Sequence, residues 1–296
     1  MSHIFRALTA EPWAIEPSWL PFLAALAQRD AGHPEVQARA AEWQQRDYRL
    51  MAGSAAQPLA GTQRAFIQDG VAILPLTGPI FPRANMMTQM SGATSVATFQ
   101  SDYRAALASA DVGAIMLLVD SPGGQVPGVA NLAAVIAAGA KKKLTVAQVT
   151  GSGASAAYWL LSAASEVYLD RTALVGSIGV VAAVPKQVAP DSEGFIDIEI
   201  VSSNAPNKRV DPESEDGQAQ IRATLDAMEG EFIADVAKYR NTTATRVKSE
   251  FMQGGVAVGA AAVNAGMADK VQSQDATQAY LARHAANQAK LNALRK

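Results

Sequence analysis

The chain alternates between short apolar runs and longer segments in which apolar residues recur every three or four positions. Four apolar runs each predict a strand buried on both faces: residues 71–76, 114–119, 144–149 and 167–169. Helical spacing marks three segments between them, at residues 96–107, 126–140 and 155–164. This alternation predicts an α/β fold in which helices cover both faces of a largely parallel sheet.

Further elements are expected beyond this core. The sheet is predicted to continue through residues 174–184 and 196–201. A long helix is predicted to follow, with Asp211 as its N-cap and Pro212 at its first helical position. Its apolar stripe would consist of Ile221, Leu225, Met228, Phe232 and Val236.

The two ends of the chain differ from the middle. Residues 1–50 have helical spacing, and residues 52–63 are small and uncharged, as is typical of a linker. From about residue 273 the chain becomes polar and is expected to form a frayed helical tail. We therefore expect a helical N-terminal extension with its linker over 1–64, one α/β domain over 65–272 and the tail over 273–296.

Composition limits the classes of partner. Of the 296 residues, 49% are hydrophobic and 18% are charged, so the chain can form a sizeable core. A net charge of −2 lacks the basic surplus typical of proteins that bind nucleic acid or anionic membranes. The first residues lack a signal-peptide pattern, and Gly, Ser and Pro interrupt the longest uncharged stretches. We expect a cytoplasmic protein with neither nucleic acid nor membrane as a partner.

The residues that are absent limit the chemistry further. The chain has no cysteine, which excludes disulfides, thiolate metal sites and a cysteine nucleophile. Its three histidines, His3, His33 and His284, all lie near the ends. A Ser-His-Asp triad or a histidine-rich metal site in the α/β domain is therefore not expected, and neither a metal nor a cofactor is predicted. A hydrolase built from this chain would need a different base.

A first candidate site follows the apolar strand 114–119, where residues 120–124 read DSPGG. Two glycines after a proline allow a sharp turn and can leave backbone N–H groups facing a cavity. Such groups could hold an oxyanion. An ordinary strand-to-helix turn is the alternative interpretation.

A second candidate site lies at residues 151–158, GSGASAAY, again between a predicted strand and a helix. A serine at a helix N-terminus lies near amide N–H groups that favour developing negative charge. Ser152 or Ser155 could instead serve only as an N-cap. The segment also matches a dinucleotide-binding fingerprint, with Asp170 nineteen residues after Gly151. The short following helix and the preceding SPGG strand argue against that last reading.

A serine nucleophile without histidine commonly relies on a lysine. The pKa of that lysine must fall from about 10.4 to roughly 7–8 for it to act as a general base. Lys186 and Lys208 are the candidates in the core region, and composition does not choose between them.

The motifs taken in order resemble the signal-peptide peptidase A family of serine proteases. They are SPGG after a strand, GSGASAAYWLLSAASEVYLD, ALVGSIGVV and a downstream lysine, and the resemblance spans about residues 66–272. It implies a Clp protease/crotonase-like fold and a Ser–Lys dyad. By position, Ser155 matches the nucleophile, Lys208 the general base, and the amides of Gly124 and Ala156 the oxyanion hole.

This chain departs from the family pattern in two places. The family often has two glycines after the nucleophile, where this chain has Ala156 and Ala157, and the segment before Lys208 is longer here. The motifs PWAI at 12–15 and PNKR at 206–209 resemble the head-maturation proteases of phages and prophages. That branch implies processing of capsid scaffold or other head proteins, in the host cytoplasm or the assembling head. It also implies a homo-oligomer in which neighbouring subunits share the active site.

Two other classes of function stay open at this point. A crotonase-type acyl-CoA enzyme also presents paired amides to an oxyanion, and it would bind CoA without depending on Ser155. A catalytically silent assembly factor would use Ser155 only as a helix cap and would keep its partner binding when that serine is replaced.

Overall fold

The computed structural model describes residues 12–16, 19, 51–53, 55–84, 93–184 and 200–294. Most of the predicted helical segment 1–50 lies outside the described residues, as do Lys186 and residues 196–199. The described residues 200–201 are not part of a strand.

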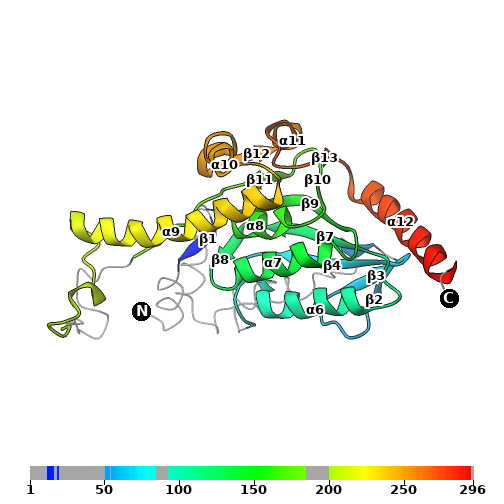
Figure 1. Cartoon of the computed structure of the whole chain (residues 1–296), viewed down its shortest axis with the longest axis horizontal. Coiled ribbons are helices and arrows are strands. Elements are labelled where there is room, and N and C mark those ends of the chain that lie inside the picture. The colour runs from blue at the N-terminus through cyan, green and yellow to red at the C-terminus, as the bar shows by residue number, and fades with distance from the viewer. Residues whose placement is uncertain are drawn as a thin grey trace, which may run out of the picture.

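Parallel strands form the centre of the main sheet, as Figure 1 shows. They are β4 (Val71–Thr77), β7 (Ala114–Ser121), β9 (Thr145–Ala154) and β10 (Glu166–Leu169). β4 pairs with β7, β7 with β9, and β9 with β10, all in parallel register. The four apolar runs of the sequence are these four strands, and the predicted α/β class is confirmed.

Antiparallel strands close the two edges of this sheet. One edge carries β3 (Phe66–Gln68) and β2 (Gln57–Pro58), so the expected linker contributes a strand. The other edge carries β11 (Leu174–Gly176), which is parallel to β9, and β12 (Val256–Val258), which is antiparallel to β11. A short strand, β13 (Lys270–Val271), pairs with β10. The strand expected over 174–184 is therefore shorter than predicted, with an isolated bridge farther on at Val181.

A second sheet of four short strands stands beside the first. Its order is β1 (Trp13–Ile15), β8 (Gly123–Gln125), β5 (Ile80–Phe81) and β6 (Thr94–Ser95). The expectation of helix over residues 1–50 is wrong at β1. These three residues are fully buried and pair with β8, and such tertiary contacts override local helical spacing.

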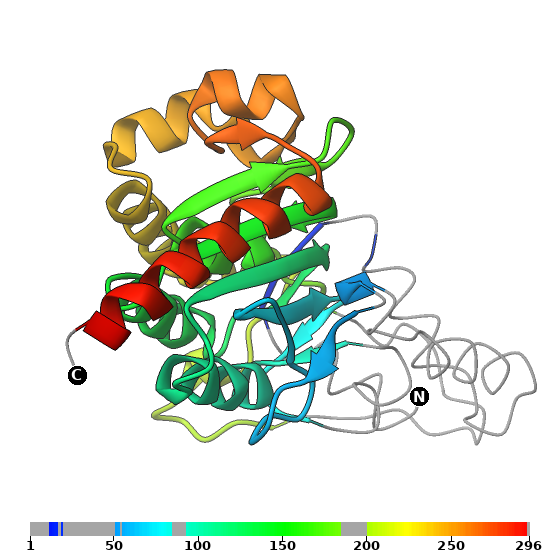
Figure 2. The same cartoon turned by 90° about the vertical axis from the view of Figure 1, so that its right-hand side faces the viewer.

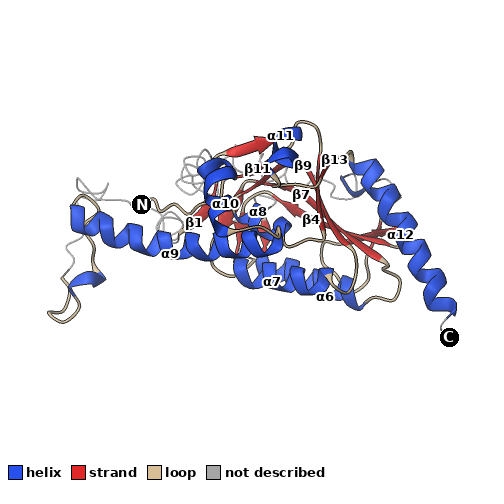
Figure 3. Cartoon of the chain, turned by 45° about the horizontal axis from the view of Figure 1, so that its top comes forward, coloured by secondary structure: helices blue, strands red, loops and turns tan. Residues whose placement is uncertain are grey.

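Helices cover the main sheet on both faces (Figures 1 and 3). One face carries α6 (Val96–Ala108), α7 (Val129–Ala140), α8 (Ala156–Ser162) and α9 (Glu215–Tyr239). The opposite face carries α12 (Gln274–Leu294), which crosses the strands in Figure 2. The side chains of β4 alternate between the two faces of the sheet. Ala72, Leu74 and Leu76 belong to the hydrophobic cluster that includes residues of α6, α7, α8 and α9. Val71 and Ile73 belong to the cluster that includes residues of α12.

Smaller elements complete the chain on either side of α9. A 3₁₀ turn, η1 (Pro206–Lys208), precedes it. After it come α10 (Ala244–Glu250), a second 3₁₀ turn, η2 (Met252–Gly254), and then β12 and α11 (Ala260–Ala265).

The long helix α9 begins later than the sequence suggested. Its N-cap is Ser214, whose hydroxyl accepts a hydrogen bond from the Gly217 amide at 3.0 Å, and not Asp211. Of the predicted apolar stripe, Phe232 and Val236 are fully buried. The other three residues are not, because the N-terminal half of α9 extends beyond the sheet (Figure 1).

Helix α12 is part of the fold and not a frayed tail. Thr277, Leu281 and Ala285 are buried against the sheet, and the Thr277 hydroxyl donates to Gln148 Oε1 at 2.6 Å. Gly113 lets the helix approach, because a Cβ there would lie only 2.7 Å from the Cα of Ala285. Helix α12 therefore packs on the sheet of the α/β domain.

Truncating the buried face of α12 should destabilise the whole domain. We expect Leu281→Ala, at a fully buried position, to lower the free energy of unfolding by about 2–5 kcal/mol. The matched control is Leu291→Ala on the same helix, where the side chain is 48% exposed and about 0.5 kcal/mol or less is expected. Urea unfolding followed by circular dichroism measures both, and equal losses would show that α12 is not packed as described.

Candidate active site

Ser155 joins β9 to α8 in a backbone conformation that non-glycine residues rarely adopt. Its φ is 53° and its ψ is −119°. The Ser155 amide donates to the carbonyl of Gly176 at 2.7 Å, and its own carbonyl accepts from the Trp159 amide at 3.0 Å. Such a conformation costs about 1–3 kcal/mol and persists only where surrounding contacts impose it. Strain of this kind is common at functional residues.

The side chain of Ser155 is buried and free. It occupies the N-cap position of α8 but makes no capping hydrogen bond. Its Oγ is fully buried and has no hydrogen-bond partner among the described residues. The alternative that Ser155 is only a helix cap is therefore wrong. A buried hydroxyl without a partner is costly, which is a reason to look for a chemical role.

Ser152 resembles Ser155 in its buried side chain but not in its backbone conformation. Its Oγ is also buried and has no partner in the part of the chain that the structure describes, and it too caps no helix. It lies within β9, however, and its backbone φ is not positive. The Ser152 amide donates to Asp120 Oδ1 at 3.0 Å, so this residue ties the ends of two neighbouring strands together.

The two glycines of the SPGG motif make close backbone contacts, Gly123 with the residues on either side of Ser155 and Gly124 with Ile80. The ladder between β7 and β9 is irregular at Val119–Ser121, and the chain then turns into β8. A Cβ on Gly123 would lie 2.9 Å from both the Ala154 carbonyl oxygen and the Ala156 amide nitrogen. A Cβ on Gly124 would lie 2.5 Å from the Ile80 amide nitrogen. Only glycine fits at either position, and the approach of Gly123 brings β8 beside Ala154 and Ala156, on either side of Ser155.

A serine holds the turn between β7 and β8. The Ser121 hydroxyl donates to the Gly78 carbonyl at 2.7 Å and accepts from the Gly123 amide at 3.2 Å. The Gly123 N–H is therefore engaged within the turn. Gly124 follows in β8, where Ala14 of β1 is its ladder partner.

The structure does not bring Lys208 to Ser155 within one chain. Lys208 ends η1, before α9, and its side chain is exposed. Helix α8 packs on α9 at Phe232, whose ring stacks on Trp159 with a centroid distance of 4.5 Å. From Phe232 back to Glu215, the helix extends about 25 Å at 1.5 Å per residue. In Figure 1 the turn that carries Lys208 lies beyond that far end of α9.

One described lysine has a lowered pKa, but it is not near Ser155. Burial lowers the pKa of Lys143, whose ammonium donates to the carbonyls of Ala106 and Ser109 at 3.1 and 2.7 Å. Lys143 precedes β9 and Ser155 follows it. A strand of ten residues spans about 33 Å, so Lys143 lies at the opposite end of β9 from Ser155 and has a structural role there.

Helix α8 is anchored by its two aromatic residues. The Tyr158 hydroxyl donates to the Met267 carbonyl at 3.0 Å, and burial raises the pKa of this phenol, which stays protonated. The Trp159 indole N–H donates to Asp235 Oδ2 at 2.9 Å. These contacts fix the helix that begins directly after Ser155.

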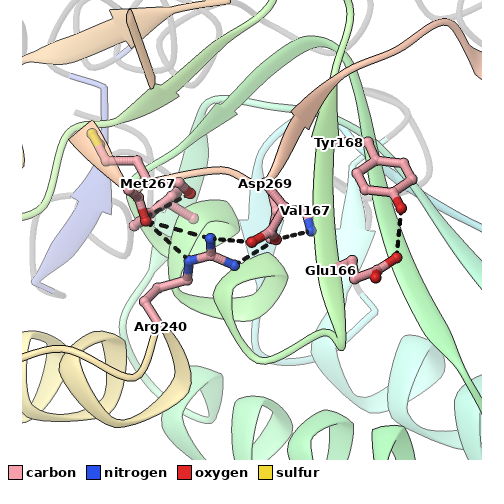
Figure 4. A network of polar contacts seen from close by, with 8 residues as sticks. Glu166, Val167, Tyr168, Arg240, Met267 and Asp269 are labelled. Carbon is pink, nitrogen blue, oxygen red and sulfur yellow. Dashed lines mark hydrogen bonds and ion pairs between the residues drawn. The ribbon is translucent and has the colours of Figure 1, made fainter. Parts of the chain in front are cut away.

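An ion pair that the sequence does not predict joins Arg240, at the end of α9, to Asp269, just before β13 (Figure 4). Both terminal nitrogens of Arg240 donate to Asp269 at 2.9 Å, and Asp269 Oδ2 also accepts from the Val167 amide at 2.7 Å. Burial opposes the charge on Arg240, but the bonds to Asp269 outweigh it and raise the pKa of the guanidinium. The two residues are 29 positions apart and belong to no motif, so nothing in the sequence pairs them.

The dinucleotide-binding interpretation of residues 151–156 is wrong. Residues 151–154 are extended within β9 and form no phosphate-binding loop, and α8 is only seven residues long. Asp170 accepts a hydrogen bond from the Gln148 side-chain amide at 3.0 Å.

Two features of the described residues bear on metals and membranes. Within that part of the chain, no group of three or more His, Asp or Glu side chains is placed to hold a metal ion. None of the described helices is long and apolar enough to cross a membrane.

Comparisons with known proteins point to one family. The model of peptidase family S49 matches residues 137–288, a range that includes Ser155, Ala156 and Lys208. The head-tail preconnector protein GP5 of Enterobacteria phage P21 is 27% identical over 92% of this chain and 55% of its own length. The capsid assembly protease C of Escherichia phage lambda is 29% identical over 71% of this chain and 48% of its own. The chain thus spans about half the length of these relatives.

A structural comparison gives a weaker likeness. A mutant of the 1510-N membrane-bound stomatin-specific protease aligns with a TM-score of 0.40 and 15% identity. The alignment covers 68% of this chain and 78% of that one.

Relieving the strain at Ser155 should stabilise the fold. Glycine adopts positive φ without penalty, so Ser155→Gly is expected to raise the free energy of unfolding by about 1 kcal/mol. The control is Ser109→Gly, where φ is −66° and the same change should lower stability by about 0.5–1 kcal/mol. Urea titrations compare the two. A loss of stability in Ser155→Gly would contradict the strained geometry.

Proposed function

The chain belongs to peptidase family S49, and from this premise we propose that it is a serine endopeptidase with Ser155 as its nucleophile. The observation that carries the proposal is the strained, fully buried Ser155, whose Oγ lacks a partner among the described residues. Gly123 approaches the adjoining Ala154 and Ala156 too closely for any side chain. Neither rival class of function gives this serine a use. An acyl-CoA enzyme would not need its hydroxyl, and an assembly factor would not need its strain.

In the proposed reaction, the Ser155 hydroxyl attacks the carbonyl carbon of a peptide bond and loses its proton to a lysine. The tetrahedral oxyanion accepts hydrogen bonds from the amides of Gly124 and Ala156, each worth about 2.7–4 kcal/mol in the transition state. As this intermediate collapses, the protonated lysine donates its proton to the leaving nitrogen, the C–N bond breaks, the amine product departs and an acyl-enzyme remains. Water, deprotonated by the same base, then hydrolyses the ester.

We propose Lys208 as the base, acting on Ser155 of a neighbouring copy. Its side chain is exposed, and the turn that carries it lies beyond the projecting half of α9, away from Ser155 of the same chain. A homo-oligomer would bring the two residues together, and an isolated chain would be inactive. Desolvation at the interface would supply the fall in lysine pKa that a general base requires.

The proposed substrates are proteins of an assembling phage head, such as the capsid scaffold, processed in the host cytoplasm or within the particle. The names of the two phage relatives support this choice. No metal or other cofactor takes part in the reaction as drawn.

The nucleophile can be tested with a fluorophosphonate probe followed by intact-mass spectrometry. On prolonged incubation the wild type should gain one adduct, and Ser155→Ala should gain none. Lys208→Ala should react about 10²–10⁴ times more slowly, as expected for loss of a general base. An adduct that survives in Ser155→Ala would contradict the assignment. Binding of CoA by a chain that gains no adduct would favour the acyl-CoA alternative.

Sharing of the site between copies predicts complementation. Ser155→Ala and Lys208→Ala should each be inactive alone, whereas a mixed oligomer should recover a measurable fraction of wild-type peptide hydrolysis. In the mixture, Lys208 of the first variant faces Ser155 of the second. The control is a mixture of Ser155→Ala with the double variant Ser155→Ala/Lys208→Ala, which contains no intact serine. Full activity in a monomeric fraction, measured by sedimentation, would refute the shared site.

A further inference from the structure

Residues 12–16 lie in a slot beside the candidate active site. On one side the Trp13 amide donates to the Val181 carbonyl at 2.9 Å, and the Val181 amide donates back to Trp13 at 2.8 Å. On the other side the Val126 amide donates to the Pro12 carbonyl at 3.2 Å, and the Glu16 amide to the Pro122 carbonyl at 2.8 Å. The strand β1 is therefore paired along both edges, between β8 and Val181.

The register of this pairing sets one carbonyl against the proposed oxyanion hole. Ala14 is the partner of Gly124, midway between the hydrogen-bonded positions at the two ends of the segment. Because such pairs recur every second residue in an antiparallel ladder, the Gly124 N–H faces the Ala14 carbonyl. A Cβ on Gly123 would overlap the Ala14 carbonyl oxygen and lie 2.9 Å from the Ala156 amide nitrogen. The Ala14 carbonyl thus lies beside both proposed donors.

The side chains of β1 fit this slot closely. Trp13, Ala14 and Ile15 are all fully buried, and Trp13 packs edge-to-face on Phe81 with a centroid distance of 5.9 Å. Ser155 is itself fully buried in this arrangement. A peptide substrate would need to reach Ser155 in an extended form, and the backbone groups that would bind it already bind β1.

We propose that residues 12–16 occupy the cleft in which a peptide substrate binds, so that the chain blocks its own active site. This inference rests on the proposed function of Ser155. The ligand of the cleft is an extended polypeptide, held as a strand by main-chain hydrogen bonds to β8 and to Val181. A large aromatic residue fits at the Trp13 position against Phe81, and a small residue fits at the Ala14 position against the two glycines.

The exchange of β1 for a substrate conserves the interactions of the cleft. Any extended peptide offers β8 and Val181 the same backbone donors and acceptors that β1 offers. The slot is short, since β1 has only three residues, so a substrate competes with few contacts. Residues 12–16 therefore compete with a peptide substrate for the cleft, and their affinity for it depends chiefly on Trp13.

A disulfide can lock or release this segment. Because the chain has no cysteine, the double variant Trp13→Cys/Gln125→Cys can form only one intramolecular bridge. Trp13 and Gln125 are partners at a position of the ladder without hydrogen bonds, where Cα atoms lie about 4.5 Å apart, within disulfide range. Oxidation holds β1 in the slot, and reduction leaves β1 there without its aromatic anchor.

The readout is the rate at which a fluorophosphonate labels Ser155, with the bridge verified by intact mass. We expect the reduced double variant to react at least tenfold faster than its oxidised form. Each single-cysteine variant should react at the same rate, within twofold, under both conditions. Recovery of the fast rate when the oxidised sample is reduced excludes misfolding as the cause.

The outcomes separate the two proposals. Equal labelling of the locked and released forms would overturn self-blocking while leaving Ser155 as the nucleophile. The absence of a Ser155 adduct from every form would overturn the proposed function and self-blocking with it. As a second measurement, the peptide Pro-Trp-Ala-Ile-Glu should slow labelling of the reduced variant at least fivefold. The same peptide with proline in place of alanine lacks the central N–H and should have little effect, and equal effects would contradict binding as a strand.

Discussion

The backbone of β8 approaches the junction of β9 and α8 so closely that no side chain fits between them at residue 123. The rest of the site depends on this contact. It sets the amide of Ala156 beside the glycine strand, and the hydrogen bonds of Ser155 to Gly176 and Trp159 hold the junction in its strained form. The parallel sheet supplies the necessary rigidity, because β7 and β9 end side by side and deliver both segments to the same edge.

Two features of the chain bear on its proposed activity. The lysine proposed to activate Ser155 is on an exposed turn beyond the projecting half of α9. The cleft proposed for the substrate holds β1, which pairs with β8. Under the two proposals, activity requires a second copy to supply Lys208 and a substrate strand to replace residues 12–16. Both requirements would confine proteolysis to an assembled particle, where copies and substrates are concentrated.

Much of the fold could be predicted from the sequence, because strands buried on both faces must be continuously apolar. The runs at 71–76, 114–119, 144–149 and 167–169 are strands for that reason, and Ser155 stands out because small residues surround it. The family resemblance drawn from the ordered motifs is confirmed by the match to peptidase family S49. Elements stabilised by distant partners could not be found in this way. β1 is three residues long and pairs with β8 more than a hundred positions away, and Arg240 meets Asp269 only through the fold. The N-cap of α9 cannot be chosen from the sequence, because Asp211 and Ser214 are both residue types that suit an N-cap. The structure shows that the Ser214 hydroxyl accepts the hydrogen bond from the Gly217 amide.

The most direct test of this account is an experimental structure of the assembled chain with a peptidyl phosphonate bonded to Ser155. The measured quantity is the distance from Ser155 Oγ to the nearest lysine Nζ. The account predicts Lys208 of a neighbouring copy at hydrogen-bond range, about 2.6–3.2 Å, and a phosphonate oxygen on the amides of Gly124 and Ala156. A Lys208 that stays exposed in every copy, or a phosphonate bonded to another residue, would contradict it.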